Sequence, residues 1–405
     1  GYQNTASSED GTIAYGANNT ATANAALAVG NNNIATGGAS TAMGVSSVAS
    51  GEASVAIGNV AQATQIRATA VGNRATATQD SASAYGNRAN ATGARTTAIG
   101  SEANALDYDT TAVGAGAQAL TGAATAVGKN ANASHQASIA IGQNAAANWT
   151  NTISIGKDTA TSKDHAIAVG TSANASGVQA VGVGSYTKAE GNLTVAVGPY
   201  AQANKEAAVA VGSNATASET NSIAVGQTAT AANNNSIAVG TKTVSRGDNA
   251  IGIGAYTEST AARSTAIGVL SQANGAGSFA GGASAQATGA NSVAIGGAQD
   301  GTLTDKAGSA AKATGNNSIA LGTASNAAGN NSIAQGNSAT AKQAADVAVG
   351  YNAKADGTST GANAEGTVNN AGSAMAIGTD SQATGIVATA IGQRSQALAN
   401  GAVAL

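Results

Sequence analysis

The amino-acid sequence predicts an all-β fold, a parallel β-solenoid in which the chain winds through short coils of equal length. Three observations predict it. Glycine recurs at every fourteenth position from Gly16 to Gly296 and again along most of the chain that follows. Apolar and polar residues alternate in two short runs per repeat, and turn-forming residues interrupt each run before a helix could form. A fixed period of this kind is typical of repeat architectures whose units stack on their neighbours.

Each repeat is predicted to contain two strands. We number positions from the repeating glycine, here called the landmark glycine, so that position −1 precedes it and +1 follows it. Val or Ile fills −1 in most repeats, Ala fills −2, and β-branched residues are common at −3. Ala fills +5 and small residues fill +3, whereas +2, +4 and +6 vary and are mostly polar. This alternation predicts two strands of about five residues joined by tight turns.

The landmark glycines are predicted to end the first strand at a place that needs positive φ or close approach of another backbone. These predicted turn glycines include Gly16, Gly30, Gly58, Gly100, Gly142, Gly226, Gly240 and Gly296.

The branched side chains are predicted to form the core of the roll, because large residues packed against alanines at +3 and +5 fill a thin two-layer core. The predicted core residues are Ile57, Val71, Ile99, Ile141, Val225, Ile237, Val239 and Ile295.

Alanine at position −2 is predicted to face away from that core. The position holds alanine in 23 of 27 repeats, which distinguishes it from a variable solvent face. Persistent smallness on an apolar face indicates that another backbone lies close to it, so the chain is expected to associate with itself there. The predicted seam residues are Ala56, Ala98, Ala140, Ala210, Ala224, Ala238 and Ala294.

The chain reads as one rod-shaped repeat domain with two irregularities. Regular repeats cover residues 1–296. Residues 297–307 are predicted to form a short irregular coil or loop, because the next landmark glycine, Gly308, arrives two positions early. Repeats continue over residues 308–405, with a degenerate coil near 361–370.

Lys306 stands at position −2 of the short interval, where alanine belongs. Its side chain either faces the axis of the assembly or loops outward into solvent, and the cost of burying like charges favours the outward loop. Asn363 and Asn369 occupy the degenerate coil. We expect both places to be the softest parts of the rod.

Composition excludes several functions. A net charge of −3 gives no basic face for nucleic acid, and no run of apolar residues is long enough for a membrane-spanning helix. The chain has no cysteine, and His135 and His165 fall at turn positions without a metal-binding partner. Serines and carboxylates are scattered. We therefore predict a non-enzyme without metal or cofactor.

The variable outer positions hold the candidate ligand contacts. Arg74 and Arg88 share position +2 on adjacent coils, as do Tyr186 and Tyr200, and Tyr256 repeats that position further along. Exposed tyrosines offer large contact area at low entropic cost. The alternatives are solvated charge for the arginines and packing between coils for the tyrosines.

The run Asn-Ser-Ile-Ala-Val-Gly at 221–226 and again at 235–240 resembles the head repeats of trimeric autotransporter adhesins, the YadA-like head. The resemblance covers essentially the whole chain. It implies a left-handed parallel β-roll, a parallel homotrimer, and display on the Gram-negative outer membrane. The stalk and the membrane barrel of that family have no counterpart in these residues, so membrane attachment is expected only through an anchor outside this piece.

The leading functional hypothesis is therefore an adhesin head that attaches to host extracellular matrix, cells or other surfaces by many weak contacts. The alternative is a structural spacer or fibre segment that projects a separate binding domain.

Overall fold

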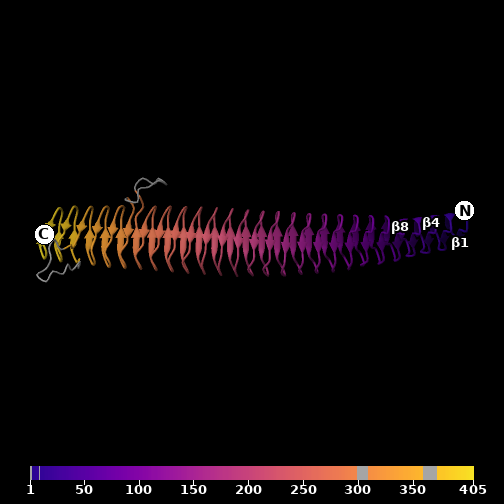
Figure 1. Cartoon of the computed structure of the whole chain (residues 1–405), viewed down its shortest axis with the longest axis horizontal. Helices are drawn as coiled ribbons and strands as arrows, with labels where there is room; N and C mark the ends of the chain where they lie inside the picture. Colours follow the sequence, from indigo (N-terminus) through magenta and orange to yellow (C-terminus); the bar gives the residue numbers. More distant parts are fainter. Residues whose placement is uncertain (1, 9, 299–308, 359–371) are drawn as a thin grey trace. The chain divides into compact units, whose positions relative to one another are not determined.

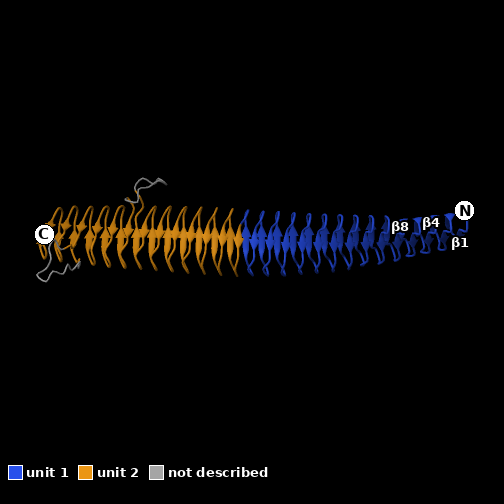
Figure 2. Ribbon diagram, in the orientation of Figure 1, with its two compact units in different colours: residues 1–200 blue, residues 201–405 orange. Residues whose placement is uncertain are grey.

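A computed structural model describes residues 2–8, 10–298, 309–358 and 372–405. The chain divides into two units, residues 1–200 and 201–405 (Figure 2). Within each unit, short strands stack coil upon coil as a parallel β-solenoid (Figure 1). The described residues make about 27 turns and are all-β, as the sequence predicts.

The strands are shorter than the sequence predicts. From β10 (Thr69–Val71) to β52 (Thr389–Ile391), each even-numbered first strand spans positions −3 to −1. The odd-numbered second strands, from β1 (Thr5–Ala6) to β53 (Gln396–Ala397), each span two residues, mostly at +4 and +5. The last first strand is β54 (Val403–Ala404).

Pairing between coils follows the period of the landmark glycines. In β32 (Ile223–Val225) and β34 (Ile237–Val239), Ala224 pairs with Ala238 and Val225 pairs with Val239. The second strands β31 (Thr216–Ala217) and β33 (Thr230–Ala231) pair with the same offset. Each residue therefore stacks on its equivalent in the next coil, and every position of the repeat forms a column.

The landmark glycines meet both predicted requirements. Gly240 has a φ of 133°, which other residues rarely adopt. A Cβ added to it would lie 2.2 Å from the carbonyl oxygen of Gly254 in the next coil. Any side chain there would force the coils apart, so the glycine period records a backbone-to-backbone contact.

The core lies where the sequence analysis did not expect it. Alanines at −2, +3 and +5, together with small residues at −4, are fully buried inside the roll. The branched residues at −1 and −3 point outward. The core prediction is therefore wrong for Ile57, Val71, Val225, Ile237 and Val239, which are half-buried, and for Ile99, Ile141 and Ile295, which are exposed. A coil closed by such short strands encloses too little space for branched side chains.

Exceptions to the alanine rule show the same tight packing. Gly252 replaces alanine at −2, and a Cβ there would lie 2.8 Å from the Ser245 hydroxyl, which replaces alanine at +5. In another coil Ser154 replaces alanine, and its hydroxyl lies 3.1 Å from that of Thr161, again at +5. In the first pair, the larger Ser245 is offset by the smaller Gly252. In the second pair, the hydroxyls of Ser154 and Thr161 hydrogen-bond each other.

The first coils close their turns differently. Strands β2 (Ile13–Ala17), β4 (Leu27–Asn31), β6 (Thr41–Val45) and β8 (Val55–Asn59) run through the landmark glycine. Asn33 is fully buried at +3, and its amide donates to the carbonyl of Gly44 at 2.8 Å and to Asn19 Oδ1 at 2.9 Å. In these coils the asparagine amides hydrogen-bond the backbone groups that a tight turn pairs in the other coils.

Stacking passes over the first irregularity. Strand β42 (Val293–Ile295) pairs directly with β44 (Ile319–Leu321), so partners are 26 residues apart instead of 14. The coil of Gly296 is therefore followed in the stack by that of Gly322. Most of the predicted short irregular coil or loop, residues 297–307, lies outside the described residues. Lys306, whose orientation the sequence left open, lies outside the described residues.

Stacking passes over the second irregularity too. Strand β48 (Val347–Val349) pairs with β50 (Met375–Ile377), 28 residues on. The fully buried carboxylate of Asp346 accepts hydrogen bonds from the backbone amides of Ala374 at 2.9 Å and Gly357 at 3.2 Å. It thus binds the two chain segments that flank this place. Asn363 and Asn369 lie outside the described residues.

Candidate functional site

The outward residues of the first strands form an apolar stripe, defined here as the side chains at positions −1 and −3 of β10 to β52. Isoleucine or valine fills most of it, and Ile99, Ile141 and Ile295 are 42%, 37% and 44% exposed. Because pairing is in register, these side chains continue from coil to coil within each unit. Contiguous exposed apolar surface of this kind marks an interaction site.

The predicted seam lies on the other face of the same strands. Every predicted seam residue has zero exposure within the single chain, so none of them can contact another chain, and the seam prediction is wrong. These residues are Ala56, Ala98, Ala140, Ala210, Ala224, Ala238 and Ala294. They stay small because the opposite sheet of the same roll lies against them. The observation of uniform smallness was sound, and the backbone that explains it belongs to the same chain.

Tyrosines at position +2 stand on the turn that follows each first strand. The rings of Tyr186 and Tyr200 stack with centroids 5.1 Å apart and an interplanar angle of 5°. Both side chains are about half exposed. Tyr256 occupies the same position of the repeat in residues 201–405, and Lys242 places its ammonium 5.0 Å from the Tyr256 ring centroid. Packing between coils, the alternative left open for the tyrosines, is present for Tyr186 and Tyr200. A role in ligand contact stays a prediction.

The arginines at +2 hold charge on the surface. Arg74 and Arg88 occupy consecutive coils, and Arg88 forms a 3.3 Å ion pair with Glu102 in the coil after it. On the opposite turn, Arg95 binds both carboxylate oxygens of Asp109, at 2.6 and 2.8 Å. Hydrogen bonding by Arg95 holds the pKa of Asp109 below its usual value. The ion pair with Glu102 partly neutralises Arg88, which favours the solvated-charge alternative for Arg88.

The sequence analysis missed one cluster, built on the second turn at position +7. His135 stacks on Trp149 with centroids 5.6 Å apart, and Lys163 lies over the same indole at 5.0 Å. The three residues follow one another at the spacing of the landmark glycines, and that spacing could have revealed them. Trp149 therefore packs against side chains of the coils before and after it.

Within the described ranges, no group of three or more histidine, cysteine or acidic side chains could hold a metal ion. No helix in those ranges is sufficiently long and apolar to traverse a bilayer.

The short coils, the alanine core and the outward apolar stripe define a class, the β-solenoid repeat proteins that expose one apolar column face along their length. Comparison with family models then identifies the family. The YadA head domain repeat (2 copies) matches residues 35–61, 63–89, 91–117, 123–145, 150–173, 162–187, 175–201, 189–215, 217–243, 245–271, 259–285, 273–298, 307–325, 313–339, 327–353 and 387–405.

The chain belongs to the YadA head family. Its repeats indicate a surface protein of the trimeric autotransporter adhesin type, as the resemblance in the sequence suggested. A search of curated proteins finds no match to the chain.

Proposed function

We propose that this chain is the head of a bacterial surface adhesin that acts as a parallel homotrimer of left-handed β-rolls. It is displayed on the Gram-negative outer membrane through an anchor outside these residues. It attaches to host extracellular matrix, cells or other surfaces. The observation that carries the proposal is the apolar stripe, in a chain of the YadA head family.

The stripe supports self-association. A second copy of this chain carries the same stripe in the same register, so branched side chains of neighbouring copies can interdigitate coil by coil within each unit. Burying the exposed half of one Val or Ile contributes about 1 kcal/mol. That contribution recurs in nearly every coil of each copy. A second copy therefore matches the period of the stripe without any other kind of partner.

Contacts with the host are then left to the outward columns away from the stripe. The stacked pair Tyr186 and Tyr200, together with Tyr256, offers aromatic area, and Arg74 and Arg88 offer charge. Each contact is weak, and repetition over three chains and many molecules multiplies it. We also propose that the chain acts by binding alone, without catalysis or cofactor.

A solid-phase assay tests the adhesive function. Purified chain is applied to collagen, fibronectin and laminin, and we expect saturable binding to at least one of them. Light scattering of the same preparation should give a trimer that persists on dilution to nanomolar concentration. A trimer that binds none of these surfaces would favour the spacer alternative. A folded monomer would contradict the role assigned to the stripe.

A further inference from the structure

The apolar stripe contains one residue that does not match its neighbours. Gln335, at position −1 of β46 (Ile333–Gln335), is exposed. Among the described stripe residues it alone carries a side-chain amide, and none of them carries a charge. In the stack it lies between Leu321 and Val349. No side chain beside it on the stripe offers a polar partner, so within a single chain its amide depends on water for hydrogen bonds.

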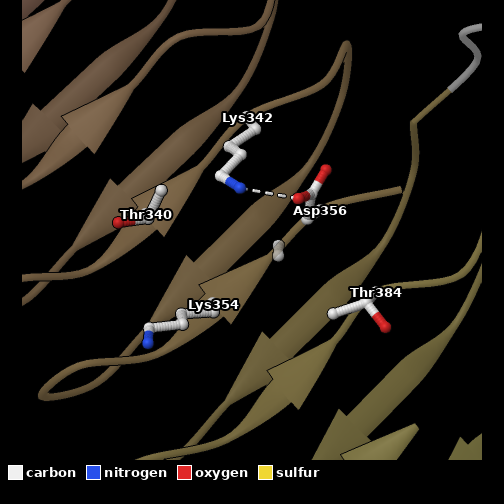
Figure 3. A pocket seen from close by; sticks show the side chains of 6 residues that line it. Thr340, Lys342, Lys354, Asp356 and Thr384 are labelled. Atoms are coloured by element: carbon white, nitrogen blue, oxygen red, sulfur yellow. Dashed lines mark hydrogen bonds and ion pairs between the residues drawn. The ribbon is translucent and has the colours of Figure 1, made fainter. Parts of the chain in front are cut away.

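Polar side chains on the opposite sheet of the same coils are placed differently. Lys342 follows β47 (Thr340–Ala341) and Asp356 follows β49 (Lys354–Ala355), and the two form an ion pair at 2.7 Å (Figure 3). A trimer built on the stripe leaves that sheet in water. The same trimer covers Gln335, whose amide then needs a hydrogen-bond partner from another copy.

The regular part of the stripe cannot fix how the copies align along the stack. From β30 (Val209–Val211) to β36 (Ile251–Ile253), both stripe positions hold only Val or Ile. A copy displaced by one coil, about 4.8 Å, therefore exchanges Val for Ile and loses little contact. A trimer joined only by such residues would have several alignments of similar free energy.

A second exception indicates that the stripe is fitted to a partner. Gly281 replaces the branched residue at −1 of β40 (Phe279–Gly281), although its φ is not positive and the backbone does not require glycine. A Cβ there would lie 2.9 Å from the ring of Phe279, which fills the space that the −1 side chain fills in other coils. The stripe thus keeps its volume where both residues change, as expected of a surface packed against another copy.

We propose that Gln335 sets the alignment of the three copies. In the aligned trimer the −1 columns face the three-fold axis, and the three carboxamides lie at one level. Each donates to the oxygen of the next and accepts from the one before. A copy displaced by one coil places its amide at the level of Leu321 or Val349 of its neighbours, where it has no partner. A single polar residue in an apolar seam fixes register in coiled coils for the same reason. The inference rests on the proposed function and names the residue that aligns its trimer.

Disulfide formation between copies can report the alignment, because the chain has no cysteine of its own. One tagged chain carries Val225→Cys and a co-expressed chain carries Ile253→Cys, both at position −1 and two coils apart. Two coils separate Cα atoms by about 10 Å, which is beyond the ~7 Å that a disulfide spans. Aligned trimers should therefore form disulfides within each kind of chain and almost none between the two kinds.

Gln335→Leu in both chains should raise the disulfides between the two kinds about tenfold, because displaced copies no longer leave a buried amide unpaired. Gln272→Leu, on the outward side of β39 (Gln272–Ala273), is the matched control and should leave the pattern unchanged. Adding Leu321→Gln to Gln335→Leu should restore the original pattern, since all copies again carry an amide at one level. Such a rescue would not occur if Gln335 acted only on the fold of its own coil. Circular dichroism should show every variant folded.

An unchanged disulfide pattern in Gln335→Leu trimers would overturn the alignment role, and so would failure of the rescue by Leu321→Gln. Absence of disulfides between copies of Val225→Cys would also overturn it, because the −1 columns would then lie away from the axis. Light scattering of the same preparations separates this inference from the proposed trimer. A monomeric wild type removes both, whereas trimers with an unresponsive pattern remove only the role of Gln335.

Discussion

Each first strand has two faces that differ in what they can accommodate. On the inner face Ala224 and Ala238 are fully buried, and on the outer face Val225 and Val239 are only half-buried. The smaller side chains are the buried ones. Burial in this fold follows the space between two very short strands, and the larger apolar residues are left for the surface, where another chain can cover them.

Val225→Asp tests the outer face and should have the largest effect, on the oligomeric state. In a trimer joined along the stripe, the carboxylate of each copy enters an apolar interface, and an uncompensated buried charge costs about 3–5 kcal/mol per chain. We expect light scattering to show dissociation. Thr230→Asp, on the outward side of β33, is the control and should keep the trimer. Equal oligomeric states for both variants would show that the stripe does not mediate assembly.

Ala224→Leu tests the inner face. The added branched side chain has no room inside the roll, and overpacking costs about 1–3 kcal/mol per chain. Chemical denaturation should show a lower midpoint than for wild type. Gln202→Leu, at the outward position of β29 (Gln202–Ala203), should shift the midpoint little. If the two leucine variants unfold together, position −2 does not face the core.

The exchange of volume between Gly252 and Ser245 sharpens the comparison. Gly252→Ala places a methyl group 2.8 Å from the Ser245 hydroxyl, and we expect a loss of about 1–2 kcal/mol. In the double variant with Ser245→Ala, part of that loss should be recovered, giving a coupling energy of about 1 kcal/mol. Strict additivity in the double-mutant cycle would indicate that the two residues do not share the same space.

The ion pair of Arg95 and Asp109 should give the smallest effect, since both side chains lie in solvent. The pKa of Asp109 is depressed in the folded chain, so its contribution is present above the unfolded pKa of about 3.9. That contribution is lost as the pH falls through the lower, folded value. Asp109→Asn should lower the melting temperature at pH 7 by about 1 °C, and this difference should shrink as the pH is lowered into the acid range. A difference that stays constant on acidification would contradict this assignment.

The repeating glycine allowed much of the fold to be predicted. Its spacing gives the coil length and the in-register stacking, and Gly240 shows why no other residue fits. Shared positions on successive coils also placed Tyr186 next to Tyr200, whose rings stack. The period is informative because residues one repeat apart in a solenoid are neighbours in space. The same logic applies to His135 and Trp149, a pair that the sequence analysis passed over.

The pairing of coils on either side of residues 359–371 was beyond sequence reasoning. Lys354 pairs with Gln382 although two full repeat lengths separate them. A period counted along the chain does not show which coils become neighbours after an interruption. Nor does it show that Asp346, a charged residue at a position usually occupied by Ser, Thr or Ala, binds the amides on both sides of the gap.

The sequence by itself determined the period, the strand-turn order, the need for glycine and the membership of an adhesin-head family. Only the tertiary structure decided which face of the first strand is the inside. Alternation along a strand places residues on two faces and cannot say which face another sheet covers, because both faces here are apolar. The closure of the coil decides which face is inside. The very short first and second strands bring the sheets so close that methyl groups and small hydroxyls fill the interior, and valine and isoleucine must face outward.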